Sequence, residues 1–286
     1  MRTRSLGTTG LAVSELGLGA GPLGDERLAD AAAERLIHGA LELGITLIDT
    51  APSYGRSEAR IGAALRGRRD RVVLSTKLGY GVPGVPDWTG PCITGGIELA
   101  LERLGTTWLD VAHLHSCPQV VLERGDVIDA LDAAVRAGKL RVAAYSGDNG
   151  ALAWAIDSGR FGVVQCSVNV ADQRALDRSV PVAAARGIGV LAKRPLANAA
   201  WREPERPDAP DRATYWDRVH AMGLTVTAES ALAFVLAQPG ISSVLVGTTS
   251  LDHLRTMTEV HALGAAAADE IRTRFRRHDR GWDGVI

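Results

Sequence analysis

The stretch ITLIDTAPSYGRSEARIGAALRGRRDRVVLSTK, residues 45–77, contains the repeating unit from which the fold can be predicted. Its two ends, 45–51 and 71–77, are short runs rich in β-branched and other apolar residues, a pattern typical of strands buried on both faces. Between them, residues 57–66 have the apolar spacing and the Ala, Leu and Arg content of a helix. The order strand, helix, strand indicates two neighbouring parallel strands joined by a helical crossover.

The same alternation continues in both directions along the chain. Further strands are expected at 13–19, 108–115, 140–146, 163–170, 189–194 and 241–247, and further helices at 26–43, 93–104, 127–137, 151–158, 180–185 and 228–237. Eight strands in 286 residues give about 36 residues for each unit. This is typical of an α/β protein with a (β/α)8 TIM barrel. A doubly wound open sheet is the alternative.

We therefore predict a single barrel domain over residues 1–286, with an N-terminal hairpin and two extra C-terminal helices at 251–263 and 266–277. Two long segments interrupt the alternation, at 80–91 and 197–216; both are rich in Pro and contain Trp, and the first is also rich in Gly. Because both follow strands, we expect them to be loops over the C-terminal mouth of the barrel, where active sites lie. Trp88 and Trp201 are accordingly predicted to line a substrate pocket.

Composition excludes several classes of partner. The chain has 32 basic and 33 acidic side chains, for a net charge of -1, so neither nucleic acid nor an anionic membrane is expected as the main partner. Three cysteines lie far apart, which indicates neither a disulfide framework nor a zinc ribbon. No apolar run follows Arg2 and Arg4, and none elsewhere is long enough to span a bilayer. We expect a cytoplasmic protein, while its oligomeric state stays open.

A glycine pattern near the start allows a second interpretation. GAGPLG, residues 19–24, matches the G-x-G-x-x-G fingerprint of dinucleotide-binding open sheets, and Asp49 stands at a later strand end. Pro22 in the turn and the continuation to eight strands favour a simpler interpretation. We expect a tight turn where the first barrel strand meets its helix.

Four polar residues stand at or just beyond strand ends: Asp49, Tyr54, Lys77 and His115. If the strands are adjacent and parallel, these side chains converge at one rim of the barrel. A buried charge needs a partner, so Lys77 is expected to pair with Asp49 and to keep its charge beside Tyr54. A neighbouring cation stabilises the phenolate form of a tyrosine, which helps it to give or take a proton. His115 would orient a carbonyl oxygen.

This set lacks a nucleophile with its base. It suits proton transfer to a carbonyl oxygen while a cofactor delivers hydride. His113 and His115 together allow a different interpretation, two metal ligands of a hydrolase barrel, which would need further ligands at other strand ends. The remaining histidines fall in expected helices, loops or the tail, so we predict no metal site.

These residues lie in segments that resemble the aldo-keto reductase superfamily over nearly the whole chain. The matching segments are LGTTGLAVSELGLG (6–19), DTAPSYG (49–55), SEARIG (57–62), STK (75–77), LERLGTTWLD (101–110) with His115 beyond it, and VLVGTTSLDH (244–253). The resemblance implies reduction of aldehydes or ketones with a nicotinamide cofactor, usually NADPH. It assigns Tyr54 as general acid, Lys77 and Asp49 as its tuning pair, and His115 as the residue that orients the carbonyl.

The resemblance also implies cofactor contacts at Gly21, Ser146, Gln165, Lys193, Arg194, Pro195, Leu196, Gly247, Thr248, Thr249, Ser250 and His253. The chain departs from the family pattern at three places. Gly147 stands where the family has an Asn after the Ser, and Lys193 where it often has a tyrosine stacked on the nicotinamide. Residues 247–250 contain no Lys or Arg to bind a 2′-phosphate, and Arg255 is the nearby cation. NADPH is expected, with NADH possible.

The sequence thus predicts an NAD(P)H-dependent aldo-keto reductase that acts on a small-molecule carbonyl. The alternative is a catalytically silent barrel that binds NAD(P)H in a regulatory role.

Overall fold

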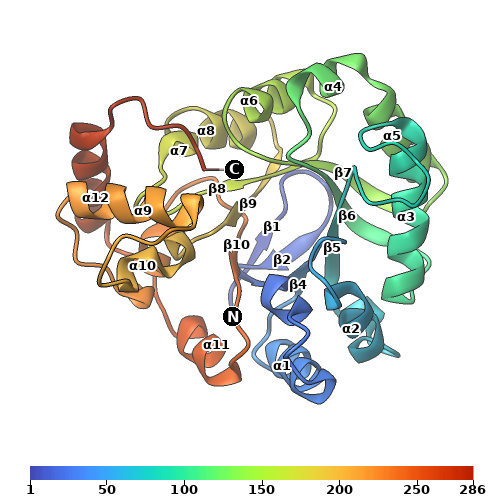
Figure 1. The fold of residues 1–286 in the computed structure, drawn as a ribbon, viewed down its shortest axis with the longest axis horizontal. Coiled ribbons are helices and arrows are strands. Elements are labelled where there is room, and N and C mark those ends of the chain that lie inside the picture. Colours follow the sequence, from blue (N-terminus) through green and yellow to red (C-terminus); the bar gives the residue numbers. More distant parts are fainter. Residues whose placement is uncertain (286) are drawn as a thin grey trace.

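Eight parallel strands form a closed barrel in the computed structural model, which describes residues 1–285 (Figure 1). In order they are β3 (Leu16–Gly19), β4 (Leu47–Asp49), β5 (Val73–Leu78), β6 (Leu109–His115), β7 (Leu140–Ser146), β8 (Val163–Ser167), β9 (Gly189–Lys193) and β10 (Ser243–Val246). Each strand pairs with the next, and β10 pairs with β3 to close the ring. The barrel prediction is confirmed. The doubly wound alternative is wrong because a closed barrel has no sheet edge.

Helices surround the barrel, where their apolar faces pack against it, and all but the last two connect one strand to the next (Figure 1). They are α1 (Asp30–Glu42), α2 (Ser57–Ala64), α3 (Gly90–Leu104), α4 (Gln119–Arg124), α5 (Asp126–Arg136), α6 (Asn149–Ser158), α7 (Arg174–Asp177), α8 (Ser179–Ala185), α9 (Pro210–Ala221), α10 (Ala228–Leu236), α11 (Leu251–Thr258) and α12 (Ala265–His278). The last two are the predicted C-terminal helices. Among the described helices, none is both long and apolar enough to cross a membrane.

An antiparallel hairpin, β1 (Thr3–Ser5) and β2 (Ala12–Ser14), precedes the barrel, as predicted. Leu6 and Val13 belong to a buried cluster with Leu47, Val111, Leu191 and the other apolar residues near the starts of the strands. Those residues share their strand faces with Asp49, His115 and Lys193, because they lie an even number of positions away. The inner face is therefore apolar at the hairpin end and polar at the other end.

The strand predicted at 13–19 is wrong as one element. The structure divides it into β2, which pairs with β1, and β3, which pairs with β4 and β10. Glu15 lies at the break, and its carboxylate accepts hydrogen bonds from Arg2 and Arg4. Both pieces are apolar and extended, so a pattern along the sequence does not separate them; their different pairing partners do.

The segment predicted as a loop at 197–216 is also partly wrong. It contains the short 3-10 helix η3 (Ala197–Arg202) and most of α9, in which Pro210 occupies the first turn. Pro is favoured there because its missing N–H would be unpaired in any case. Within η3, Ala197, Asn198 and Ala199 all have left-handed backbone conformations, with φ of 47°, 52° and 54°. Any residue other than Gly is disfavoured in this region of backbone conformation.

We predict that Ala199→Gly stabilises the protein. Ala199 has φ 54° and ψ 25°, a conformation that costs an alanine about 1–2 kcal/mol. Part of this gain is offset because glycine also gives the unfolded chain more freedom. The midpoint of thermal unfolding should rise by a few degrees at most. Ala221→Gly, in the regular helix α9, is the matched control and should lower it.

Candidate active site

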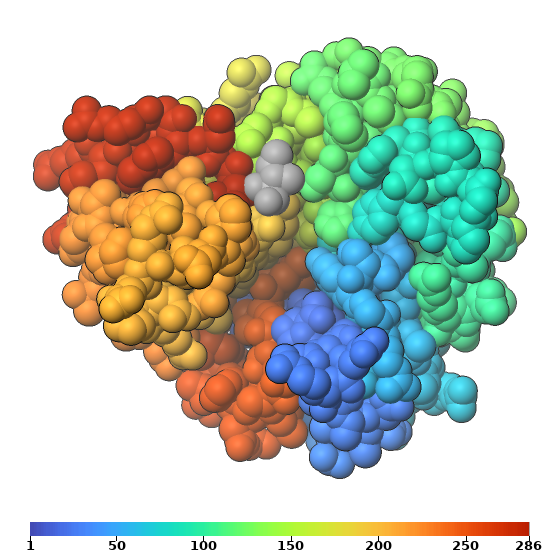
Figure 2. All heavy atoms as spheres, viewed as in Figure 1, coloured from blue at the N-terminus to red at the C-terminus, as the bar shows by residue number. Residues whose placement is uncertain are grey.

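A cavity of about 620 Å³ opens at the polar end of the barrel, and on the face drawn in Figure 2 it lies near the centre. Most of the predicted site residues line it, namely Gly21, Asp49, Tyr54, Lys77, His115, Gln165, Lys193, Arg194, Pro195, Leu196 and Gly247. Sequence reasoning missed other lining residues: Gly19, Pro22, Ser116, Asn198, Ala199 and Leu245. Several of these adjoin predicted positions, and that adjacency is the signal that could have found them.

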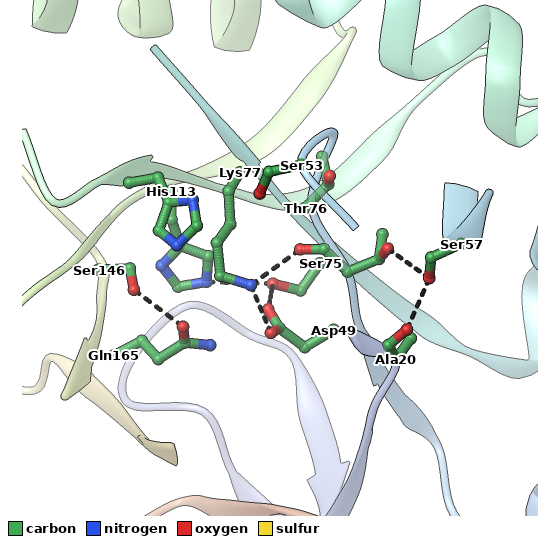
Figure 3. Close-up of polar contacts among 12 residues, drawn as sticks. Ala20, Asp49, Ser53, Ser57, Ser75, Thr76, Lys77, His113, Ser146 and Gln165 are labelled. Carbon is green, nitrogen blue, oxygen red and sulfur yellow. Dashed lines mark hydrogen bonds and ion pairs between the residues drawn. The ribbon is translucent and has the colours of Figure 1, made fainter. Parts of the chain in front are cut away.

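Lys77 and Asp49 form a buried ion pair beneath this cavity (Figure 3). Lys77 Nζ donates to Asp49 Oδ2 over 2.6 Å and to the carbonyl oxygen of Thr50 over 2.8 Å. Ser75 Oγ donates to the other carboxylate oxygen over 2.8 Å. Burial by itself raises the pKa of Asp49, but the charge of Lys77 and the hydrogen bonds from Lys77 and Ser75 act together to hold that pKa below its usual range. Both groups are therefore charged.

The expected pairing follows from the register of three strands. Asp49 lies opposite Ser75 in the β4–β5 ladder, and Lys77 lies opposite His113 in the β5–β6 ladder. His113 extends the polar chain, because its Nε2 lies 3.0 Å from Ser75 Oγ. Burial, more than any nearby charge, lowers the pKa of His113 to about 4. Since Ser75 donates to Asp49, its oxygen accepts from the neutral imidazole.

Tyr54 lies on the loop between β4 and α2, and its backbone is fixed from both sides. Its N–H donates to Ala51, and its carbonyl oxygen accepts from Ser57 N. A side chain at Gly24 would overlap that same carbonyl group, so η1 (Gly21–Gly24) packs directly against the loop. Lys77 Nζ lies 4.9 Å from the centroid of the Tyr54 ring. The tyrosine is thus held beside a buried cation.

His115 lies at the end of β6, with its ring edge-on to that of Tyr54. The two rings are 6.4 Å apart between centroids and nearly perpendicular. Burial, followed by the positive charges of Lys77 and Lys193, lowers the pKa of His115 to about 3. The imidazole is therefore neutral near pH 7. Tyr80, which sequence reasoning did not single out, lies with its hydroxyl 2.5 Å from His115 Nδ1.

Gln165 presents an unpaired donor beside the cavity that it lines. Ser146 Oγ donates to Gln165 Oε1 over 2.8 Å, which fixes the orientation of the amide (Figure 3). Gln165 Nε2 is buried and has no hydrogen-bond partner among the described residues. An unpaired buried donor is costly. The amide fits an acceptor supplied by a bound molecule.

Two departures from the family pattern have local physical causes. A side chain at Gly147 would overlap the hydroxyl of Tyr145, so the position has no room for Asn. Lys193 does not project as an uncompensated cation, because its Nζ pairs with Asp148 over 2.9 Å. Asp148 therefore neutralises Lys193, which stands where the family often has a tyrosine.

The C-terminal tail docks on the same rim and fixes Arg194. Arg194 Nη1 donates to the carbonyl oxygen of Val285 over 2.5 Å, and Ser167 Oγ donates to the same oxygen over 3.1 Å. Gly284 exchanges hydrogen bonds in both directions with the side chain of Asn149. The tail thus forms part of the surroundings of the cavity.

Several predicted residues lie outside the lining of this cavity. Ser250 caps α11 by accepting a hydrogen bond from His253 N, and neither residue lines the cavity; nor do Thr248, Thr249 or Ser146. Trp88 packs against Tyr80, and Trp201 Nε1 donates to Leu196 O. Trp201 therefore supports a lining segment from outside, and Trp88 supports Tyr80, which contacts the lining residue His115. Within residues 1–285, no three metal-binding side chains are grouped to hold an ion.

Comparison with known proteins agrees with this geometry. The model of the Aldo/keto reductase family matches residues 15–273. L-galactose dehydrogenase of Arabidopsis thaliana is 32% identical over 91% of this chain and 89% of its own length. The NADH-specific methylglyoxal reductase of Escherichia coli is 26% identical over 96% and 98%. The holo form of an aldo-keto reductase from Bacillus halodurans superposes with a TM-score of 0.83 at 26% identity, covering 96% of both chains.

We predict that Gly24→Ala destabilises the protein and displaces the Tyr54 loop. The added methyl group would overlap backbone atoms of Tyr54, which cannot move aside as a side chain can. Overpacking of this kind typically costs about 1–3 kcal/mol, measurable by urea unfolding. Gly264→Ala is the control, because an added methyl group there meets no atom within 4 Å. Equal stability of the two variants would contradict the close packing of η1 on the loop.

Proposed function

The chain belongs to the aldo/keto reductase family of oxidoreductases, and we propose that it reduces an aldehyde or ketone to an alcohol with Tyr54 as the general acid. The observation that carries this proposal is the buried Lys77–Asp49 pair beside the ring of Tyr54. A fixed cation lowers the free energy of the phenolate that remains after the tyrosine gives up its proton. Asp49 keeps that cation in place and keeps it charged.

His115 lies next to Tyr54 and complements it. A neutral imidazole can donate one hydrogen bond to a carbonyl oxygen without competing for the proton that Tyr54 transfers. Burial lowers the pKa of His115 to about 3, so the imidazole is neutral near pH 7. Together the two side chains would orient the carbonyl group and supply its proton.

The cavity fits a nicotinamide cofactor, which supplies hydride when it is bound. Gln165 would hold the carboxamide, because its orphaned Nε2 is a donor fixed by Ser146. Gly21, Arg194, Pro195, Leu196 and Gly247 would bind the rest of the cofactor along the rim that they line. Thr248, Thr249, Ser250 and His253, at the start of α11, would contact its adenosine end. Backbone N–H groups at a helix start favour an anion there.

The chain offers few cationic side chains to bind a 2′-phosphate. Residues 247–250 contain no cation, and Arg255 is paired with Asp252 over 3.1 Å. NADPH, the expected cofactor, therefore has no strong electrostatic advantage over NADH. One relative in the family is described as NADH-specific.

The proposed substrate is a small-molecule carbonyl compound, free in the cytoplasm. A cavity of about 620 Å³ has to hold the reactive part of the cofactor as well as the substrate. Relatives named for L-galactose and methylglyoxal act on small polar molecules. Methylglyoxal, 4-nitrobenzaldehyde and L-galactose, the last tested in the oxidative direction, make a first panel.

Tyr54→Phe should lower carbonyl-dependent oxidation of NAD(P)H at least 100-fold, because it removes the transferred proton. Binding of the cofactor should be unchanged. Turnover is measured by absorbance and binding by tryptophan fluorescence. Tyr145→Phe is the matched control, since that hydroxyl donates to Cys117 O outside the cavity, and it should retain turnover within threefold. Full turnover by Tyr54→Phe would refute the mechanism, and cofactor binding without any turnover across the panel would favour the silent regulatory barrel.

The dissociation constants of NADPH and NADH should differ by less than about tenfold, or about 1.4 kcal/mol. The reason is that neither a free Lys nor a free Arg lies in the described segment 247–253. Parallel fluorescence titrations measure both constants, and Arg255→Ala should change the ratio less than threefold. A preference for NADPH of 100-fold or more would mean that another cation reaches the phosphate.

A further inference from the structure

Tyr80 lies beside the site and has no role in the chemistry proposed so far. It follows β5 by two residues, and its hydroxyl oxygen lies 2.5 Å from His115 Nδ1 and 2.9 Å from Ser53 Oγ. Ser53 immediately precedes Tyr54 and is exposed. One hydroxyl thus joins the end of β6 to the loop that holds the general acid.

The ring of Tyr80 is held in place by the loop at 79–89. Trp88 packs edge-on against it with centroids 6.2 Å apart, and the ring of His115 lies 5.7 Å from it. Trp88 N donates to Gly79 O over 2.8 Å, and Arg124 donates to Trp88 O over 2.5 Å. A side chain at Gly79 would overlap the indole. The hydroxyl of Tyr80 is therefore fixed at Nδ1.

The two nitrogens of a neutral imidazole cannot both donate. One carries the proton and the other accepts, and the partner of one nitrogen decides the state of the other. Burial raises the pKa of the Tyr80 phenol, so it keeps its proton at neutral pH. A phenol O–H is a stronger donor than a neutral imidazole N–H, and an imidazole lone pair is a stronger acceptor than a phenol oxygen. Ser53 Oγ can donate to the phenol oxygen in turn.

We propose that Tyr80 is a positioning residue, whose hydroxyl donates to Nδ1 of His115 and thereby keeps the imidazole proton on Nε2. Nε2 is then the nitrogen available as a donor to the cavity that His115 lines. This role rests on the proposed function, in which His115 donates to the carbonyl oxygen of the substrate. In the opposite arrangement, with the proton on Nδ1, the cavity would face a lone pair that repels that oxygen.

The tautomer can be observed without any turnover. In protein labelled with ¹⁵N-histidine at pH 7, two-bond ¹H–¹⁵N correlation spectra distinguish the two neutral forms, and His115→Ala assigns the signals of His115. The wild type should show the Nε2–H form, and Tyr80→Phe should show a mixture with the Nδ1–H form. An Nδ1–H form in the wild type, or an unchanged spectrum in Tyr80→Phe, overturns the proposal.

Kinetics then test whether Tyr80 acts through His115. With methylglyoxal or 4-nitrobenzaldehyde, whichever is turned over faster, Tyr80→Phe should lower kcat about tenfold, the usual effect of one lost hydrogen bond. The dissociation constant of the reduced cofactor should stay within twofold. Ser53→Ala removes only the outer hydrogen bond and should cost less than about threefold. The ring contacts with Trp88 and His115 remain in Tyr80→Phe.

In the His115→Ala background, Tyr80→Phe should change the residual kcat less than twofold, because two residues that act as one unit are not additive. A further tenfold loss there would show that the hydroxyl acts elsewhere and would overturn the proposal. The proposed function fails separately, if Tyr54→Phe retains turnover. The tautomer measurement would still decide what Tyr80 does to His115.

Discussion

The buried ion pair between Lys77 and Asp49 is the interaction on which the rest of the site depends. Two charges removed from water are costly unless each is paired and hydrogen-bonded. Here Lys77 donates to Asp49 and to Thr50 O, and Ser75 and then His113 complete the chain behind the carboxylate. The closed barrel provides this arrangement because its strand register brings Asp49 and Ser75 side by side. The cation beside Tyr54 is thereby fixed rather than mobile.

Residues that pack the core and residues that form the site lie at opposite ends of the barrel axis. Inward-facing positions near the starts of the strands are apolar and pack with Leu6 and Val13 of the hairpin. Positions two to four residues later on the same faces carry Asp49, Lys77, His115, Gln165 and Lys193. Since the hairpin end is packed with apolar side chains, the cavity opens at the other end. There the loops can differ from those of relatives without disturbing the core.

Compensation of charge explains how this chain departs from its family near the nicotinamide region. Lys193 forms an ion pair with Asp148, and Gly147 leaves room for the hydroxyl of Tyr145. The departures at Gly147 and Lys193 are therefore accommodated by neighbouring residues. Lys77 and Lys193 together with burial keep His115 neutral. A neutral histidine needs a defined tautomer, and Tyr80 is the residue placed to define it.

The sequence by itself determined the barrel and the convergence of Asp49, Lys77 and His115. Both follow from regular geometry, because alternation along a strand fixes which face a residue takes and the ends of parallel strands meet at one rim. Only the tertiary structure decided that residues 13–19 divide between a hairpin and the barrel, that α9 forms within an expected loop, and that Trp88 supports Tyr80 rather than lining the cavity. These outcomes depend on contacts between segments far apart in the sequence. The spacing of residues within one segment does not reveal such contacts.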